Sequence, residues 1–426
     1  MEREPLREIL RQDLSFARTQ TDRLFRMLAP AAIHERPIPE RHRVIFYLGH
    51  LEAFDWNMIC AGSFGMPSLN SQFDRLFEFG IDPVDGQLPA DQPSDWPGVE
   101  EIISYRDRTR AAVDDILNRA TPANGQIFRV AIEHRLMHAE TLAYMFHWLD
   151  YELKRERPPA ALGGRPLHEG DNAKRAIRIP SGHATLGQTV NGQSSSFGWD
   201  NEFQSHSAFV PEFSIDPYNV TNADFLRFVR AGCYEDRSLW TSDARTWVQQ
   251  AGIRHPKFWI RRGDDWFYRT MFEAIPLPPD WPVYVSHAEA SAYARWKRKS
   301  LPTEAQYHRA AFGSPDGAER FGHPEGNFGF RSWTPTPVGS FPPSPFGIFD
   351  LAGNGWEWTS TPFAPFDGFE PFPFYRGYSA DFFDGKHFVL KGASPRTAAA
   401  LVRRSFRNWF QAYYPNVYAT FRCVEN

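Results

Sequence analysis

The sequence predicts an α+β protein with two unlike parts, a four-helix bundle over residues 1–152 and an irregular α+β domain over residues 176–426. In the first part, apolar residues recur at three- and four-residue spacing, which is typical of helices that bury one face. In the second part, the composition shifts toward Gly, Pro, Ser and aromatic residues, and apolar runs are short. The charged stretch KRERPPAALGGRPLHEGD lies between them, and its Pro and Gly content indicates a linker over residues 153–175.

The first predicted helix has one apolar face. Similar patterns predict helices over residues 43–59, 99–117 and 126–153. A Pro- and Gly-rich segment, residues 66–97, separates the second helix from the third, so we expect a bundle with one long crossover. The apolar face of the first helix consists of Leu6, Ile9, Leu10, Leu14, Ala17, Leu24 and Leu28.

Regular structure should be sparse in the second part. Aromatic residues make up 15% of the chain, and with 35 Pro and 30 Gly they indicate loops held by bulky anchors. One helix is predicted in HAEASAYARWKRK, before the breaker LPT. Brief strands are predicted at residues 176–179, 266–268, 282–285 and 388–390.

The composition excludes several classes of protein. The 426 residues include 47 basic and 51 acidic side chains, a net charge of −4, so we expect no nucleic-acid partner. No apolar run approaches the 18 residues of a transmembrane helix, and MEREPLREILRQD lacks the apolar core of a signal peptide. We therefore expect a cytoplasmic protein that binds no membrane, and nothing indicates an obligate protein partner. Cys60, Cys233 and Cys423 are too scattered for a disulfide framework or a cysteine-based zinc site.

Three histidines form the sharpest chemical signal. In EHRLMHAETLAYMFHWL, His134 and His138 stand four residues apart, so they share one face of the predicted helix. His50, on the second predicted helix, is the best candidate for a third ligand from a facing helix. Three neutral nitrogen ligands leave coordination positions open, as in a catalytic metal site, and do not separate iron from zinc. An isolated pair of this spacing also occurs by chance.

Longer phrases along the chain resemble known families. His50 together with HRLMHAE resembles the metal site of the DinB-like bundle in ergothioneine-type sulfoxide synthases. The second part is similar to the formylglycine-generating-enzyme, or sulfatase-modifying-factor, domain, which has a C-type-lectin-like fold. FGWDNE is especially typical of the two-domain synthases. The phrases that carry the second resemblance are IPSGHATLG, FGWDNEF, YNVTNADFLRFV, LPTEAQYHRAA, GIFDLAGNGWEWT, VLKGAS and RRSFRNWF…YATFRCV.

The resemblance implies a non-haem Fe(II) enzyme whose metal ligands are His50, His134 and His138. Such an enzyme uses O2 to couple a thiol to the imidazole C2 of hercynine (trimethylhistidine), which gives a sulfoxide in ergothioneine biosynthesis. The expected partners are therefore small molecules, namely hercynine, a thiol or selenol, and O2.

The resemblance also implies a catalytic tyrosine in the second domain, which keeps the reaction from oxidising the thiol alone. Tyr375-Arg376-Gly377-Tyr378 resembles the paired-tyrosine segment of the family. We expect Tyr375 to be the catalytic donor and Tyr378 to be its neighbour in the substrate network. The alternative is that both are aromatic anchors.

The phrase RRSFRNWF supplies the candidate substrate-binding residues. Asn408 and Trp409 match residues that contact hercynine in the family. The Asn amide both donates and accepts hydrogen bonds, and the indole face suits a quaternary ammonium. Arg404 and Arg407 are candidates for a carboxylate clamp, because Arg binds carboxylates with two hydrogen bonds. Ordinary core packing of Trp409 and ion pairs of the two arginines are the alternatives.

Two departures from the family pattern affect the assignment of the substrates. Many ergothioneine synthases have Gln before the second helix histidine, where it hydrogen-bonds the hercynine imidazole, whereas this chain has Met137, which cannot donate a hydrogen bond. Either another side chain takes that role or the acceptor differs. Forms that use γ-glutamylcysteine carry an acidic and a basic residue just after the RNW motif, where this chain has the uncharged residues 410–414. The second departure favours cysteine, and it keeps a selenoneine synthase that couples hercynine to a selenosugar as an alternative.

Two other classes remain as alternatives. DinB-like bundles also support metal-dependent hydrolases and thiol transferases, and lectin-like folds also occur in binding modules. The tyrosine segment and the RNW motif favour oxidation over hydrolysis, and three clustered histidines have no purpose in a pure binding module.

Overall fold

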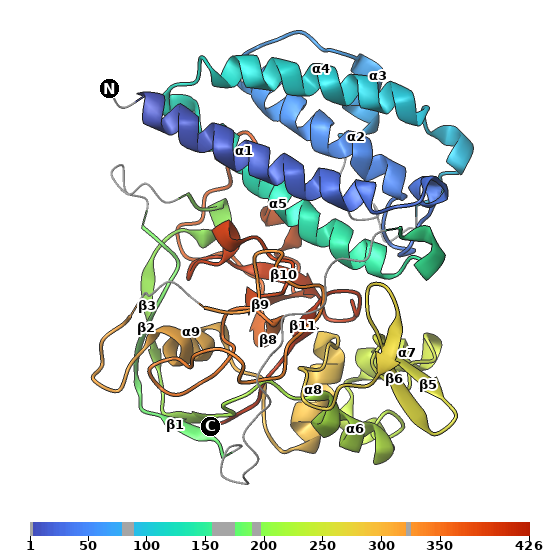
Figure 1. The fold of residues 1–426 in the computed structure, drawn as a ribbon. Coiled ribbons are helices and arrows are strands. Elements are labelled where there is room, and N and C mark those ends of the chain that lie inside the picture. The colour runs from blue at the N-terminus through green and yellow to red at the C-terminus, as the bar shows by residue number, and fades with distance from the viewer. Residues whose placement is uncertain (1–2, 79–88, 156–174, 190–196, 321–324) are drawn as a thin grey trace. The chain divides into compact units, whose positions relative to one another are not determined.

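The structure divides into two compact units, Met1–Pro158 and Pro159–Asn426. The first is helical, and the second combines short helices with small sheets (Figure 1). The predicted α+β class, with a helical first part, is confirmed. The structure is a computed structural model that describes residues 3–78, 89–155, 175–189, 197–320 and 325–426.

Long helices build the first unit and run alongside one another (Figure 1). The helix α1 contacts α5, and α2 contacts α4. A π-helical segment, η2 (Trp56–Ser63), continues directly from α2. The long helices are α1 (Arg3–Arg26), α2 (Val44–Asp55), α4 (Val99–Leu117) and α5 (Gly125–His147).

The sequence predicted the long helices of this unit better than the segment between them. The helix expected over residues 99–117 has those bounds, whereas the last one ends at His147 and not at residue 153. The crossover contains a short helix, α3 (Ser71–Leu76), that the sequence pattern did not predict. Ile9 was wrongly assigned to the apolar face of α1, since its side chain is 48% exposed. It directly precedes the buried Leu10 and so points about 100° away from it.

Short helices of the second unit begin at side-chain caps. Ser286 accepts from the N–H of Glu289 at the start of α8, and Glu289 accepts in return from the N–H of Ser286. The predicted helix HAEASAYARWKRK ends early, at Trp296, because Arg298 already has a positive φ of 56°. The helices are α6 (Asn222–Arg230), α7 (Ser242–Gln250), α8 (His287–Trp296) and α9 (Glu304–Phe312).

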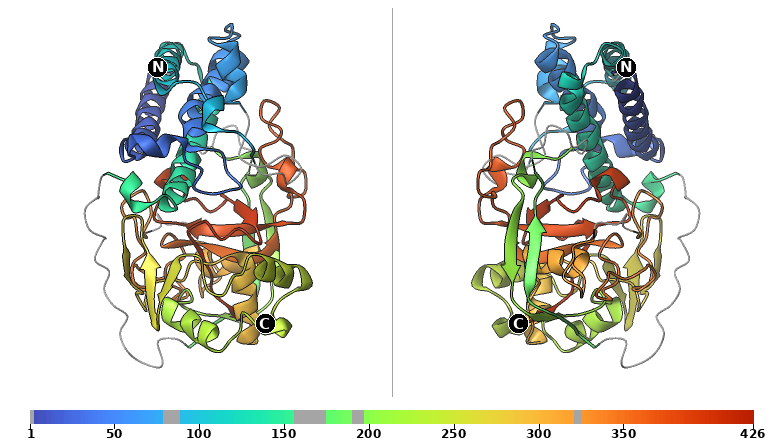
Figure 2. Two further views of the ribbon diagram at one scale, coloured as in Figure 1. Left: turned by 90° about the vertical axis from the view of Figure 1, so that its right-hand side faces the viewer. Right: turned by 90° about the vertical axis from the view of Figure 1, so that its left-hand side faces the viewer.

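The described strands of the second unit form four separate sheets. The strands β2 and β3 pair antiparallel and lie side by side (Figure 2). The sheet orders are β1-β4-β12, β10-β9-β8-β11, β2-β3 and β5-β6-β7. The strands are β1 (Ile177–Ile179), β2 (Gly182–Leu186), β3 (His206–Val210), β4 (Phe213–Ile215), β5 (Trp259–Arg262), β6 (Asp265–Arg269), β7 (Ala274–Pro276), β8 (Gly355–Pro362), β9 (His387–Ala393), β10 (Asn408–Gln411), β11 (Ala419–Thr420) and β12 (Val424–Glu425).

Three of the four predicted β runs correspond to strands: two lie within β6 and β9, and the run 176–179 begins one residue before β1. The fourth, residues 282–285, forms no strand and contains only an isolated bridge between Pro282 and Thr221. Val283 donates to the carbonyl of Val220 and Val285 to that of Ala419, so this run bonds to two different segments and not to one ladder. The predicted linker lies mostly outside the described residues.

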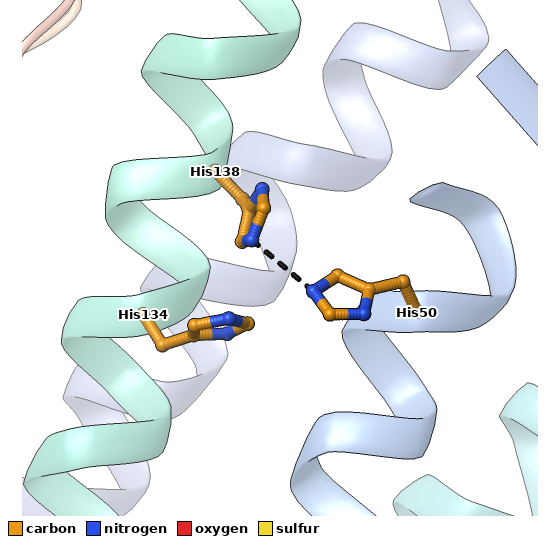
Figure 3. Close-up of side chains that lie close together, drawn as sticks. All are labelled: His50, His134 and His138. Carbon is orange, nitrogen blue, oxygen red and sulfur yellow. Dashed lines mark hydrogen bonds between the residues drawn. The ribbon is translucent and has the colours of Figure 1, made fainter. Parts of the chain in front are cut away.

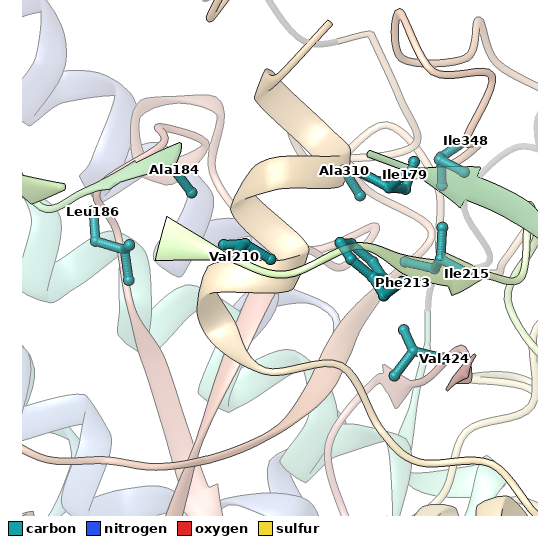
Figure 4. Close-up of a cluster of buried hydrophobic side chains, with 9 residues drawn as sticks. All are labelled: Ile179, Ala184, Leu186, Val210, Phe213, Ile215, Ala310, Ile348 and Val424. Carbon is teal, nitrogen blue, oxygen red and sulfur yellow. The ribbon is translucent and has the colours of Figure 1, made fainter. Parts of the chain in front are cut away.

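Nine buried side chains form one core of the second unit (Figure 4). Ala310 of α9 packs there against side chains of β1–β4, and Ile348 and Val424 complete the cluster. This core joins the pair β2–β3 to α9. The strands β8–β10 belong to a separate sheet, and several candidate site residues lie in that sheet or beside it.

Candidate active site

Helices α2 and α5 bring the three predicted histidines together (Figure 3). His134 and His138 project from one face of α5 toward His50 of α2. The Nε2 atoms of His50 and His138 are 3.2 Å apart, and one ring nitrogen from each of the three residues lies within 4.8 Å of the others. All three side chains are buried, with exposed fractions of 3%, 4% and 2% for His50, His134 and His138. Their role as metal ligands stays a prediction.

The protonation states of these rings suit a metal ion. Burial lowers the pKa of His50 to about 4, and it lowers the pKa values of His134 and His138 well below the ordinary value of 6.5. Repulsion between neighbouring rings adds to the effect of burial. The three imidazoles are therefore neutral near pH 7, which is the form that binds metals. Nδ1 of His134 and Nδ1 of His138 are buried and have no hydrogen-bond partner among the described residues. Three neutral imidazoles, two of which have a ring nitrogen without a hydrogen bond to any described residue, are suitable ligands for a divalent transition metal.

A buried charge network links α2 to α5 beside the histidines. Arg135, which follows His134, is 0% exposed. Its Nη2 donates to Asp55 at 2.7 Å, and Nη1 and Nη2 each lie 3.1 Å from the Glu52 carboxylate. Arg110 of α4 also donates to Glu52, at 2.7 Å. The network therefore fixes the two helices that carry the histidines, one turn or less from each ligand candidate.

Sequence reasoning did not predict this network. Its signal was available, because Glu52, Asp55 and Arg135 interrupt otherwise apolar stretches and lie close in sequence to His50 or His134. Charges in an apolar helix are rarely buried unless they are paired, so they indicated partners on a facing helix.

The second unit gathers the predicted tyrosines and Trp409 into one aromatic cluster. Tyr378 stacks on Trp199 with ring centroids 3.9 Å apart and meets Trp409 edge-on at 5.3 Å. The rings of Tyr375 and Tyr378 are 5.6 Å apart. Phe363 stacks on Trp409 at 4.2 Å. Trp199 belongs to the FGWDNE phrase, and its contact with the tyrosine segment was not predicted.

The FGWDNE phrase also holds the tyrosine segment through hydrogen bonds. Ser379, directly after Tyr378, donates to the Asp200 carboxylate and accepts from Asn201 Nδ2 at 3.0 Å. Burial, followed by the nearby Asp200 charge, raises the pKa of Tyr375 to about 12. The Tyr375 phenol therefore keeps its proton at neutral pH.

The structure places the remaining predicted residues in or near β10. Asn408 accepts from the N–H of Trp409 at 2.9 Å. Arg407 is buried and forms a two-bond ion pair with Glu304, at 3.0 and 3.1 Å. Arg404 contacts Glu319 at 3.4 Å. The arginines therefore form the ion pairs that the sequence left as an alternative, and a substrate-binding role for them stays a prediction.

Comparisons with known proteins match both parts of the chain. Residues 13–153 match the DinB superfamily, and residues 165–426 match the sulfatase-modifying factor enzyme 1-like domain. The chain is 32% identical to the hercynine oxygenase of Mycolicibacterium smegmatis, over 95% of each chain. The chain belongs to the hercynine oxygenase family. The resemblance to ergothioneine-type sulfoxide synthases is thereby confirmed, and an oxidative enzyme is indicated.

Other relatives of this family agree. The hercynine oxygenase of Mycobacterium tuberculosis is 33% identical over 75% of this chain and 76% of its own length. Ergothioneine biosynthesis protein 1 of Neurospora crassa is 28% identical over 94% of this chain, which spans only 56% of that protein. Among the described helices, none has both the length and the apolar character needed to cross a bilayer.

Proposed function

We propose that this member of the hercynine oxygenase family is a non-haem Fe(II), O2-dependent sulfoxide synthase of ergothioneine biosynthesis. It forms a C–S bond between the imidazole C2 of hercynine and a thiol, with cysteine favoured. One oxygen atom of O2 becomes the sulfoxide oxygen, and the other leaves as water with the hydrogens from C2 and the thiol. The observation that carries the proposal is the buried, neutral trio of His50, His134 and His138 in a chain of this family.

The three histidines would hold the metal. When bound, Fe(II) supplies redox chemistry with O2 and attracts a thiolate. The protein contributes a rigid, buried set of ligands, because Arg135 fixes α2 against α5 and all three rings are buried. Rigid placement of ligands and substrates lowers the barrier by removing the entropy of assembly.

Residues of the second unit would bind hercynine and donate a proton during the reaction. Tyr375, protonated at neutral pH, donates from its Oη, and its ring lies beside that of Tyr378, which stacks on Trp199. The indole of Trp409 attracts the trimethylammonium group, and Asn408 can hydrogen-bond the imidazole. Arg404 and Arg407 would bind the substrate carboxylate. Each guanidinium would then contact two carboxylates at once, that of the substrate and that of its present partner, Glu319 or Glu304.

A second candidate, a selenoneine synthase that uses a selenosugar, is kept as an alternative by one observation. Residues 410–414 hold none of the charged groups that forms using γ-glutamylcysteine carry after the RNW motif. Met137 departs from the family pattern on the hercynine side, so it bears on how the imidazole is held and not on the choice of donor.

The experiment that tests the proposal supplies one donor at a time. The Fe(II)-loaded protein is incubated without O2 with hercynine and cysteine, γ-glutamylcysteine or a selenosugar, and O2 is then admitted. Mass spectrometry should detect the hercynine–cysteine sulfoxide. Coupling with the selenosugar alone would transfer the assignment to the second candidate, and the absence of O2 uptake with every pair would reject both.

A further inference from the structure

One ring nitrogen of His50 is held by the backbone. Its Nδ1 lies 2.7 Å from the carbonyl oxygen of Phe77. A carbonyl can only accept a hydrogen bond, so Nδ1 carries the proton and Nε2 presents its lone pair toward His138. The segment that ends at Phe77 therefore sets both the tautomer and the direction of this ligand candidate.

Side-chain hydrogen bonds fasten that segment to the rest of the first unit. Phe77 is the C-terminal cap residue of α3. The Asp74 carboxylate of α3 accepts from the hydroxyl of Tyr105 on α4 at 2.8 Å and from the hydroxyl of Ser68. Asn57 of η2 donates to the Asp74 carbonyl at 3.1 Å. Tyr105 is fully buried and Asp74 nearly so. The hydrogen bond between them therefore lies in a region of low dielectric, where it is strong and well oriented.

The missing side chain of Gly49 lets Phe77 lie close to α2. A Cβ atom at position 49 would lie 2.5 Å from ring carbons of Phe77, far inside van der Waals contact. The Phe77 ring cannot retreat easily, because it is fully buried and packs against Phe73 and Trp96. Gly49 directly precedes His50, so a side chain there would displace the carbonyl that His50 contacts.

We propose that α3 and Phe77 form a strap, residues 70–77, that positions His50 for metal binding, with Gly49, Asp74 and Tyr105 as its positioning residues. Metal-bound histidines commonly donate their second ring N–H to a carbonyl or carboxylate, and loss of that partner typically lowers metal affinity roughly 10- to 100-fold. The inference rests on the metal site of the proposed function and adds to it the residues that orient one ligand.

The test measures Co(II) binding to the full metal-free chain by visible absorption. We expect Gly49→Ala and Tyr105→Phe each to weaken Co(II) binding about 10- to 100-fold. Gly125→Ala is the matched control, because a Cβ there would meet only Leu6, at an ordinary 3.7 Å. Tyr105→Phe removes only the hydroxyl and keeps the ring, so it tests the strap even where Gly49→Ala impairs folding.

A second readout separates positioning from general loss of structure. In ¹⁵N NMR of the metal-free protein, the His50 ring should show a protonated Nδ1 and an unprotonated Nε2, and Gly49→Ala should abolish that preference while the amide spectrum of α1 stays unchanged. Affinities within twofold of wild type for both variants would overturn the strap, provided that His138→Ala loses Co(II). Full retention of Co(II) by His138→Ala would overturn the metal site and the strap together.

Discussion

Replacing Arg135 should expose how strongly the buried charge network holds the two histidine-bearing helices together. In Arg135→Met, the carboxylates of Glu52 and Asp55 would face one another in the interior, and Glu52 would keep its ion pair with Arg110. Burial alone raises the pKa of Glu52, but Arg135 and Arg110 outweigh it and lower the value from 4.5 to about 2. That net change, which both arginines produce together, corresponds to roughly 3 kcal/mol at neutral pH, since each tenfold change in proton affinity is about 1.4 kcal/mol.

Breaking a buried ion pair by removing one partner typically costs about 3–5 kcal/mol, which agrees with this magnitude. The assay is peptide-resolved hydrogen–deuterium exchange of the full metal-free chain, because a two-unit protein has no single free energy of unfolding. Protection of α2 and α5 should fall by roughly two to four powers of ten, since each tenfold change is about 1.4 kcal/mol. Arg119→Met is the matched control, because Arg119 pairs with Asp115 on the surface at 67% and 66% exposure.

The pH dependence of the loss has a definite sign. Because the folded-state pKa of Glu52 lies below 4.5, its contribution is fully present above pH 4.5 and disappears as the pH falls toward 2. The difference between Arg135→Met and wild type should therefore shrink below pH 4.5. Unchanged protection of α2 and α5 in Arg135→Met at pH 7 would refute the reasoning, as would an equal loss in Arg119→Met.

Three further predictions concern the site residues. His138→Ala should abolish stoichiometric Fe(II) binding, measured by metal analysis after desalting, while His183→Ala, at an exposed position of β2, should bind like wild type. Tyr375→Phe should keep its Fe(II) but divert cysteine toward its sulfinic acid, and an unchanged product ratio would reject Tyr375 as the donor. In ultraviolet titration, wild type and Tyr375→Phe should differ by one phenol that ionises near pH 12. Because the folded-state pKa of Tyr375 exceeds the unfolded value of 10, this group disfavours folding as the pH rises from 10 to 12. A difference in phenolate absorbance between the two proteins already at pH 10 would contradict the burial of Tyr375.

Local periodicity predicted what depends on neighbours in sequence. The four-residue spacing of His134 and His138 predicted one helix face, and the bounds of α4 followed from the apolar pattern. The helix α3 was missed because six residues within a Pro- and Gly-rich segment provide too little periodicity. The hydrogen bond that anchors it joins Asp74 to Tyr105, which are 31 residues apart.

Pairings between distant residues explain the other omissions. Arg135 finds Glu52 and Asp55 at separations of 83 and 80 residues, and no local pattern specifies such partners. Family resemblance pointed to Tyr375 and Tyr378 but not to their stacking on Trp199, which is 179 residues before Tyr378. The side chains of Arg404 and Arg407 could be assigned to ion pairs only once Glu319 and Glu304 were placed beside them.

Hercynine-dependent O2 uptake by the Fe(II)-loaded chain tests the central claim most directly. An oxygen electrode compares wild type and His138→Ala, each with cysteine present and with hercynine added or withheld. We predict that wild type consumes one O2 per hercynine–cysteine sulfoxide formed, and that His138→Ala consumes none above the rate of free iron. Equal uptake by the two proteins, or uptake by wild type without any coupled product, would contradict the assignment of the three histidines to a hercynine-coupling iron site.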